Sequence, residues 1–197
     1  MDLTNHFLLS MPGLSNSWFD RTITYLFEHN EDGAFGFVIN RPAALLAGEV
    51  YDQLEIECIS PADRSAVVYE GGPVDKERGF VLFPSNKPTD KPGDKLSNKL
   101  YTDAQSCTEG RGVTLAGSTD ILTEIGNGNG PDDYLLLLGY AGWDAGQLED
   151  EMANNSWLTC EASQEILFAD DVNQKFNLAA STLGIQFDLI SSEAGHA

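Results

Sequence analysis

The run DYLLLLGYAG, from Asp133 to Gly142, constrains the fold more than any other stretch of this 197-residue chain. It is far shorter than the roughly 20 apolar residues that a helix needs to cross a bilayer. A short apolar run bounded by turn residues is typical of a strand that is buried on both faces. We therefore expect this segment to be a central strand of a β-sheet inside a folded core.

The rest of the chain alternates between strand and helix patterns. RTITYLFEHN and AFGFVIN surround the turn EDG, which predicts a β-hairpin. Further strands are expected at 66–74, 79–83, 112–117, 157–160 and 165–168, helices at 44–54, 118–126, 144–155 and 170–184, and a long exposed loop at 84–99. No repeat or domain boundary is evident. This order predicts one mixed domain over residues 1–197, more α+β than doubly wound.

Charge and cysteine usage narrow the possible functions. The formal net charge is −20, which repels nucleic-acid phosphate and anionic membranes at long range. Cys58, Cys107 and Cys160 are widely spaced and odd in number, which favours free thiols in a reducing compartment. The N-terminus lacks the basic and apolar regions of a secretory signal. We expect a cytoplasmic protein that does not bind membranes. The charge disfavours direct nucleic-acid binding, for which the basic segment from Lys76 to Lys99 is the remaining candidate.

Motifs that would identify an enzyme are missing from the sequence. It contains no H-E-x-x-H, G-x-S-x-G or P-loop pattern, and GNGNGPDD precedes a strand rather than a helix. No histidine has metal-ligand spacing to another histidine or cysteine, so we expect no bound metal or cofactor. Whether the chain is an enzyme stays open. The enzymatic alternative is a hydrolase or transferase that uses carboxylates with His29.

The stretch LGYAGWDAGQLEDEMANNSW leads from the apolar strand into an acidic helix. Asp144 is a suitable N-cap, and Gln147 three residues later completes a pattern like a capping box. Leu148 and Met152 share one helix face and should pack inward. The glycines allow tight turning or close approach of the backbone. The stretch is thus either a strand-to-helix junction or the wall of a binding pocket.

Several segments together resemble the AlgH/YqgE family of bacterial proteins. They are FLLSMPGL, FEHNEDGAFGFVINRP, EGGPV with RGFVLF, the stretch LGYAGWDAGQLEDEMANNSWL, and LGIQFDLISSEAGHA, and they span nearly the whole chain. The resemblance implies a bifurcated mixed β-sheet that forms a pseudo-barrel flanked by helices. It implies no established enzymatic activity, although some members are described as regulators of exopolysaccharide production. Phe83 departs from the family pattern, in which histidine often follows GFVL.

The leading hypothesis is a regulatory protein that binds a small ligand or a protein partner. The expected binding surface consists of Asn40, Arg41, Pro42, Gly71, Gly72, Pro73, Tyr140, Gly142, Trp143 and Gln147. Arg41 would bind a carboxylate or phosphate through its paired donors, Trp143 would enclose the ligand, and Gln147 would orient it. Arg41 could alternatively form an internal salt bridge to Glu149 or Glu151. The partner and the oligomeric state stay open.

Overall fold

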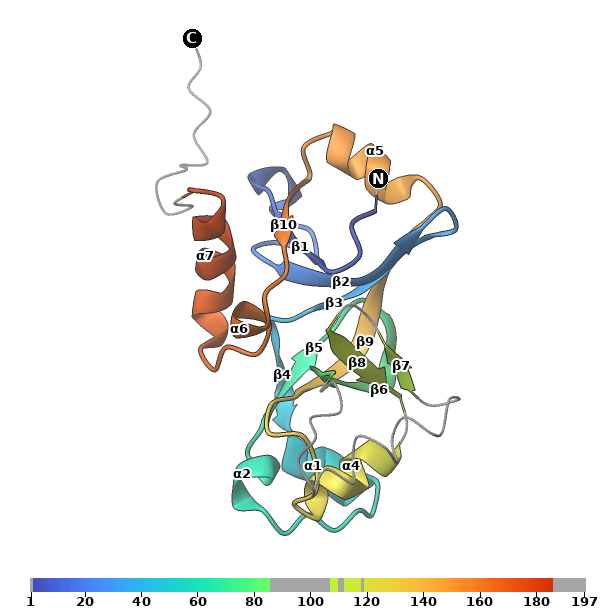
Figure 1. Cartoon of the computed structure of the whole chain (residues 1–197), viewed down its shortest axis with the longest axis vertical. Coiled ribbons are helices and arrows are strands. Elements are labelled where there is room, and N and C mark those ends of the chain that lie inside the picture. Colours follow the sequence, from blue (N-terminus) through green and yellow to red (C-terminus); the bar gives the residue numbers. More distant parts are fainter. Residues whose placement is uncertain (1, 86–106, 110–111, 118, 186–197) are drawn as a thin grey trace. The chain divides into compact units, whose positions relative to one another are not determined.

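The computed structural model describes residues 2–85, 107–109, 112–117 and 119–185 (Figure 1). The chain divides into two compact units: unit 1 comprises Met1–Asn40 and Ala141–Ala197, and unit 2 comprises Arg41–Tyr140. Strand β9 (Leu135–Asp144) contains the boundary, so its first part belongs to unit 2 and its last part to unit 1. The single domain over 1–197 stays a prediction.

Unit 1 is built on an antiparallel sheet. Its strands are β1 (His6–Ser10), β2 (Ile23–Asn30), β3 (Gly33–Val38), the end of β9 and β10 (Trp157–Glu161), in the order β10-β1-β2-β3-β9. The pair β2–β3 is the hairpin that the sequence predicts, with a bulge between Leu26 and Glu28. At Gly36 a Cβ atom would lie 2.3 Å from the Tyr25 carbonyl oxygen, so only glycine lets these two strands approach as they do.

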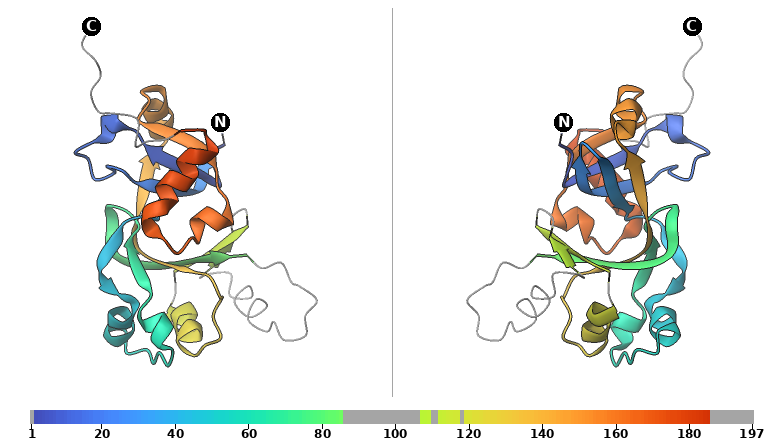
Figure 2. Two further views of the ribbon diagram at one scale, coloured as in Figure 1. Left: turned by 90° about the vertical axis from the view of Figure 1, so that its left-hand side faces the viewer. Right: turned by 90° about the vertical axis from the view of Figure 1, so that its right-hand side faces the viewer.

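Short helices complete unit 1. They are η1 (Pro12–Leu14), α5 (Gln147–Ala153), α6 (Gln164–Leu167) and α7 (Val172–Thr182). Helix α7 covers one face of the strands of unit 1 (Figure 2) and contacts β1. It begins after Asp171, whose carboxylate accepts the Asn173 backbone N–H at 3.0 Å and so caps the helix. Its buried face includes Phe176, Ala179 and Ala180, as the helical spacing predicts.

Unit 2 contains a mixed sheet. Its strands are β4 (Pro42–Leu46), β5 (Val67–Glu70), β6 (Val74–Pro84), β7 (Cys107–Glu109), β8 (Val113–Ala116) and the start of β9. Strand β9 pairs in parallel with β5 and antiparallel with β6, while β4 extends the sheet beyond β5 and β8 extends it beyond β6. The apolar run Leu135–Leu138 therefore lies between two partner strands. Its predicted central position is confirmed.

Helices α1 (Ala47–Gln53), α2 (Pro61–Arg64) and α4 (Thr119–Gly126) gather at one end of the unit 2 strands (Figure 1). Tyr51 of α1 and Ile121 of α4 are fully buried against the sheet residues Val68, Val81 and Leu136. Phe83, at the position where relatives often have histidine, belongs to the same cluster and is 6% exposed. In this chain that position is part of the apolar core.

The predicted α+β class is confirmed, and the sheet is mixed. Strand β9 takes part in the sheets of both units, which is the expected bifurcation. Among the strands of the described ranges the sheet is not closed into a barrel. The expected pseudo-barrel therefore corresponds here to an open, bifurcated sheet. Within the same ranges, no helix has the length and apolarity that crossing a membrane requires.

Two predicted elements differ from the structure, and a third lies almost wholly outside the described residues. Residues 165–168 were expected to be a strand, but they lie in or directly after α6, because the Ser163 hydroxyl accepts the Ile166 N–H and caps a helical turn. The helix expected at 44–54 begins only at Ala47, since the preceding residues pair with β5 as β4. The loop predicted at 84–99 lies almost wholly outside the described residues.

Candidate functional site

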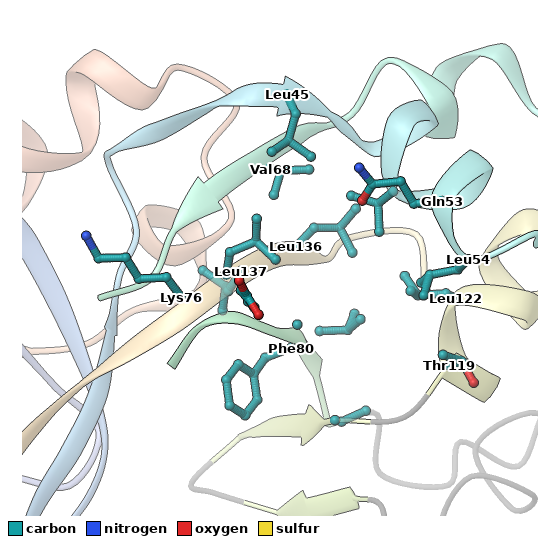
Figure 3. A pocket seen from close by; sticks show the side chains of 17 residues that line it. Leu45, Gln53, Leu54, Val68, Lys76, Phe80, Thr119, Leu122, Leu136 and Leu137 are labelled. Atoms are coloured by element: carbon teal, nitrogen blue, oxygen red, sulfur yellow. The ribbon is translucent and has the colours of Figure 1, made fainter. Parts of the chain in front are cut away.

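Unit 2 contains a pocket of about 560 Å³ (Figure 3). Strands β4, β5, β6, β8 and β9 form its walls together with helices α1 and α4. Its apolar lining comprises Leu45, Val50, Leu54, Val68, Phe80, Val81, Ala116, Leu122, Leu136, Leu137 and Leu138. The volume lies within the range of roughly 300–1,000 Å³ that is usual for small-molecule sites.

The local sequence explains why these side chains surround a pocket. Leu136, Leu137 and Leu138 are consecutive residues of β9, which has a partner strand on each side there, so the lining includes a continuous apolar segment of this strand. Val50 of α1 and Leu54, which caps the end of this helix, belong to one i, i+4 apolar row of the sequence, and both line the pocket. Leu54 is 44% exposed.

A bulge in β6 brings two charged residues to the pocket. Between Val74 and Gly79 the register against β9 shifts, and Asp75 adopts a φ of 46°. Gly139 of β9 has a φ of +69°, and a Cβ atom there would lie 2.7 Å from the Val74 carbonyl oxygen. The close approach of the bulge to β9 therefore requires glycine at this position, and it places Lys76 and Glu77 among the lining residues.

Gln53 and Thr119 are the other polar residues of the lining. In the view of Figure 3 the Gln53 amide extends from α1 toward Val68, whereas the Lys76 ammonium group points away from Leu136 and Leu137. Polar groups are thus few around the pocket, and the Gln53 amide is placed to meet a bound molecule. The apolar walls with few polar groups are typical of a ligand site.

Six of the ten predicted surface residues belong to unit 2: Arg41, Pro42, Gly71, Gly72, Pro73 and Tyr140. Their backbones join strands, since the Arg41 carbonyl oxygen accepts the Glu70 N–H and Gly71 N–H donates to Leu138 at 2.7 Å. Tyr140 packs edge-on against Phe80. None of the six lines the 560 Å³ pocket. Pro42 begins β4, Gly71, Gly72 and Pro73 connect β5 to β6, and Tyr140 lies within β9. The part of the six residues in ligand binding stays a prediction.

The other four residues, Asn40, Gly142, Trp143 and Gln147, belong to unit 1. Asn40 joins two backbone segments, because its amide donates to the Arg21 carbonyl oxygen and accepts the Ile23 N–H, each at 2.9 Å. Trp143 is only 6% exposed and lies in the core cluster of unit 1. Its edge also borders a shallow hollow of about 210 Å³. Its enclosure of a ligand stays a prediction.

Glu151 holds two tryptophans together, a contact that the sequence does not reveal. Its Oε2 atom accepts the indole N–H of Trp143 at 2.9 Å and that of Trp157 at 2.7 Å. Gln147 donates to the Oε1 atom at 2.9 Å from the preceding turn of α5. The i, i+4 spacing of Gln147 and Glu151 is visible in the sequence, but the pairing of distant tryptophans on one carboxylate depends on the sheet.

The predicted capping box at the start of α5 is only half present. Gln147 accepts the Asp144 backbone N–H at 3.1 Å, as a capping box requires. However, Asp144 ends β9 and Gly146, with a φ of 79°, is the N-cap. Asp144 as N-cap was therefore wrong, because the tight turn at Gly146 starts the helix two residues later. Leu148 is buried and Met152 packs against the same cluster, as predicted.

His29 forms hydrogen bonds through both ring nitrogens. Its Nδ1 atom accepts the Leu3 backbone N–H at 3.1 Å, so this nitrogen carries no proton and Nε2–H donates to Glu149 at 3.0 Å. The side chain of His29 is 1% exposed, whereas that of Glu149 is 47% exposed. The pKa of Glu149 is lowered by its own backbone N–H and then by His29. His29 lines neither of the two pockets.

No group of three or more His, Cys, Asp or Glu side chains could hold a metal ion among the residues that the structure describes. The pocket of unit 2 is thus the main candidate site. Sequence reasoning missed most of its lining. The apolar rows at 44–54 and in β9 were visible, but such rows indicate core packing and a pocket equally well.

Comparison with known proteins finds relatives over the whole chain. The sequence model of the AlgH-like family matches residues 7–188. A UPF0301 protein of Pseudomonas syringae is 44% identical over 196 residues, 99% of this chain and 96% of that protein. UPF0301 protein AlgH of Pseudomonas aeruginosa is 42% identical with the same coverage.

Two solved structures are similar to this chain. The solution structure of the AlgH protein from Pseudomonas aeruginosa has a TM-score of 0.75 and 41% sequence identity, and the match covers 100% of this chain and 97% of that one. The crystal structure of protein DIP2367 from Corynebacterium diphtheriae has a TM-score of 0.61 at 17% identity, with coverage of 85% and 80%. The second likeness concerns the fold alone.

Proposed function

The chain belongs to the AlgH-like family, and we propose that it is a binding protein for a small, mainly aliphatic molecule. The observation that carries this proposal is the 560 Å³ pocket of unit 2 with its lining of leucine, valine and alanine side chains. Transfer of an apolar ligand into such a pocket removes apolar surface from water on both partners. The binding energy would therefore come mainly from the hydrophobic effect.

The pocket is unusual as a feature of structural packing alone. Apolar side chains that border an empty pocket lack the dispersion contacts that they would have in a filled core. Val68 and Leu136 belong to the core cluster of unit 2 with Tyr51, Ile121 and Ile125, and they also line the pocket. A retained hollow next to a dense core supports a role in binding.

The proposal includes the regulatory role and the cytoplasmic location that the sequence predicts. A ligand that binds the folded state stabilises it in proportion to the logarithm of ligand concentration. Ligand binding in the pocket would stabilise α1 and the β6 bulge, which both border it, to an extent that depends on the ligand concentration. A partner protein that contacts these elements would then bind according to that concentration.

The enzymatic alternative has weaker support. A general base needs a nitrogen or oxygen within hydrogen-bond reach of the substrate. Both ring nitrogens of His29 are already bound, one by Leu3 and one by Glu149, and its side chain is almost fully buried. A reaction at His29 would first require one of these bonds to break.

A neutral solvatochromic dye tests the binding proposal, because its fluorescence rises in an apolar site. Gly79 lines the pocket, and a Cβ atom there meets nothing within 4 Å, so Gly79→Phe can add bulk to the pocket without a backbone clash. Gly13 is equally open but lies in η1 of unit 1, which makes Gly13→Phe the matched control.

We expect the wild type and Gly13→Phe to bind the dye with saturation, and Gly79→Phe to lose most of the signal. Circular dichroism checks that each variant is folded. Dye binding by folded Gly79→Phe at wild-type affinity would show that the pocket is not the binding site.

A further inference from the structure

We infer that the ligand of this pocket is an aliphatic chain with an uncharged hydrogen-bonding head group, such as a primary amide. This inference rests on the proposed binding function and adds the chemical class of the ligand. It depends on three features of the lining: the kind of apolar surface, the charges at the rim and the position of Gln53.

The apolar surface favours an aliphatic chain over an aromatic ring. Phe80 is the only aromatic side chain among the described residues that line the pocket. Figure 3 shows its ring directed away from Val68 and Leu136. The ring is already in contact with Tyr140, at 6.2 Å between centroids, and with the Arg78 guanidinium, 5.0 Å from its centroid. A bound molecule would therefore meet methyl and methylene groups rather than a stacking surface.

The charges at the rim do not select a charged head group. Lys76 and Glu77 are the only charged residues among the described residues of the lining, and they are of opposite sign. The whole bulge from Asp75 to Arg78 contains two acidic and two basic residues and has no net charge. In addition, the Lys76 ammonium group points away from the pocket in Figure 3. An anionic head would also approach a chain whose formal net charge is −20.

Gln53 supplies a polar contact of the matching type. It is the last residue of α1, and its amide extends toward the pocket on the side of Val68 (Figure 3). A glutamine amide offers both a donor and an acceptor without charge. Within the described part of the chain no hydrogen bond of this side chain is found. A primary amide or hydroxyl head group could thus pair with it while the chain lies among the leucines.

Isothermal titration with three compounds of equal chain length tests this inference. Octanamide, octanoate and octylamine share a chain of about eight carbons, which is within the size range of pocket ligands. At about pH 7 the last two carry opposite charges and the first carries none. The protein variants are Gln53→Leu and, as a matched control at an exposed position of helix α6 in unit 1, Gln164→Leu.

We expect wild type to bind octanamide at least about fivefold more tightly than either charged compound, which is the usual effect of one hydrogen bond. Gln53→Leu should lower the octanamide affinity about fivefold and leave octanoate binding unchanged, while Gln164→Leu should match wild type. If Gln53→Leu does not fold, Gln53→Glu replaces it, and its new negative charge should weaken octanoate binding and make octylamine, rather than octanamide, the tightest of the three ligands.

The other outcomes separate this inference from the proposed function. Tightest binding of octanoate, or of octylamine, would overturn the uncharged head group while the binding function stands. Equal affinity for all three compounds would show that no head group is recognised, which also overturns the inference. Failure of all three compounds to bind, together with failure of the dye, would contradict the binding function itself.

Discussion

Replacing Lys175 by methionine removes a buried ammonium group from unit 1, and we expect this to remove a pH-dependent part of the stability. The Lys175 side chain is 0% exposed, and its Nζ atom donates to the Leu167 carbonyl oxygen at 2.9 Å. Burial lowers the pKa of this lysine from 10.5 to about 8, and only the nearby Asp170 acts in the opposite direction. Methionine keeps a similar length without the charge.

The sign of the pH effect on stability follows from how strongly Lys175 binds its proton in the folded and in the unfolded chain. Below pH 8 both the folded and the unfolded chain carry the proton on Lys175, so stability does not change there. Between pH 8 and 10.5 the unfolded chain binds the proton and the folded chain does not, so a rise in pH disfavours unfolding. From pH 7 to about 9.5 this group should add about 2 kcal/mol to the free energy of unfolding.

Urea unfolding at both pH values measures this change. The quantity to compare is the pH-dependent difference in the free energy of unfolding between wild type and Lys175→Met, with Lys76→Met as the exposed control. Burial raises the pKa values of Tyr25 and Tyr51, which lowers stability at still higher pH, but these groups are the same in all three proteins and cancel in the difference. If wild type and Lys175→Met show the same dependence on pH, Lys175 is not a buried charge.

Three further predictions concern unit 1. Glu151→Ala should lower the free energy of unfolding by about 2–4 kcal/mol, because the buried N–H groups of Trp143 and Trp157 lose their acceptor. Urea unfolding measures this change, and a loss of stability no larger than that of Glu151→Gln would contradict the prediction. Glu149 has a lowered pKa, so it adds stability above its ordinary pKa, and this stability is lost as the pH falls through the lowered value. The free energy of unfolding of Glu149→Gln should therefore depend less on pH in the acid range than that of wild type. The same acid dependence in both proteins would refute this. Gly36→Ala should lower the free energy of unfolding by about 2 kcal/mol or more, because its Cβ atom would clash with a β2 carbonyl oxygen. Thermal or urea unfolding measures this change, and an unchanged midpoint would contradict the close approach of β2 and β3 at this residue.

The sequence predicts elements well where one local pattern decides the outcome. The apolar run of β9 and the β2–β3 hairpin depend on strand patterns and turn residues, and both are confirmed. Residues 165–168 failed because their apolar pattern fits either element, and the cap at Ser163 decides for a helix.

The candidate site is harder to predict because it is made of residues far apart in the sequence. Leu45, Val68, Leu122 and Leu136 meet only once the sheet and the helices of unit 2 are assembled. Signature glycines and Trp143 attract attention in the sequence, yet Gly139 serves the close approach of two strands and the Trp143 indole N–H binds Glu151. A conspicuous residue type thus indicates structural demand as readily as function.

Methyl-resolved NMR with octanamide is the most direct test of ligand binding in unit 2. The spectra follow leucine and valine methyl groups of the pocket together with the indole N–H of Trp143. We predict saturable shifts at Leu45, Val68, Leu122 and Leu136, with no change at Trp143. Shifts confined to Trp143 and its neighbours in unit 1, or no saturable shift at all, would contradict the assignment of ligand binding to this pocket.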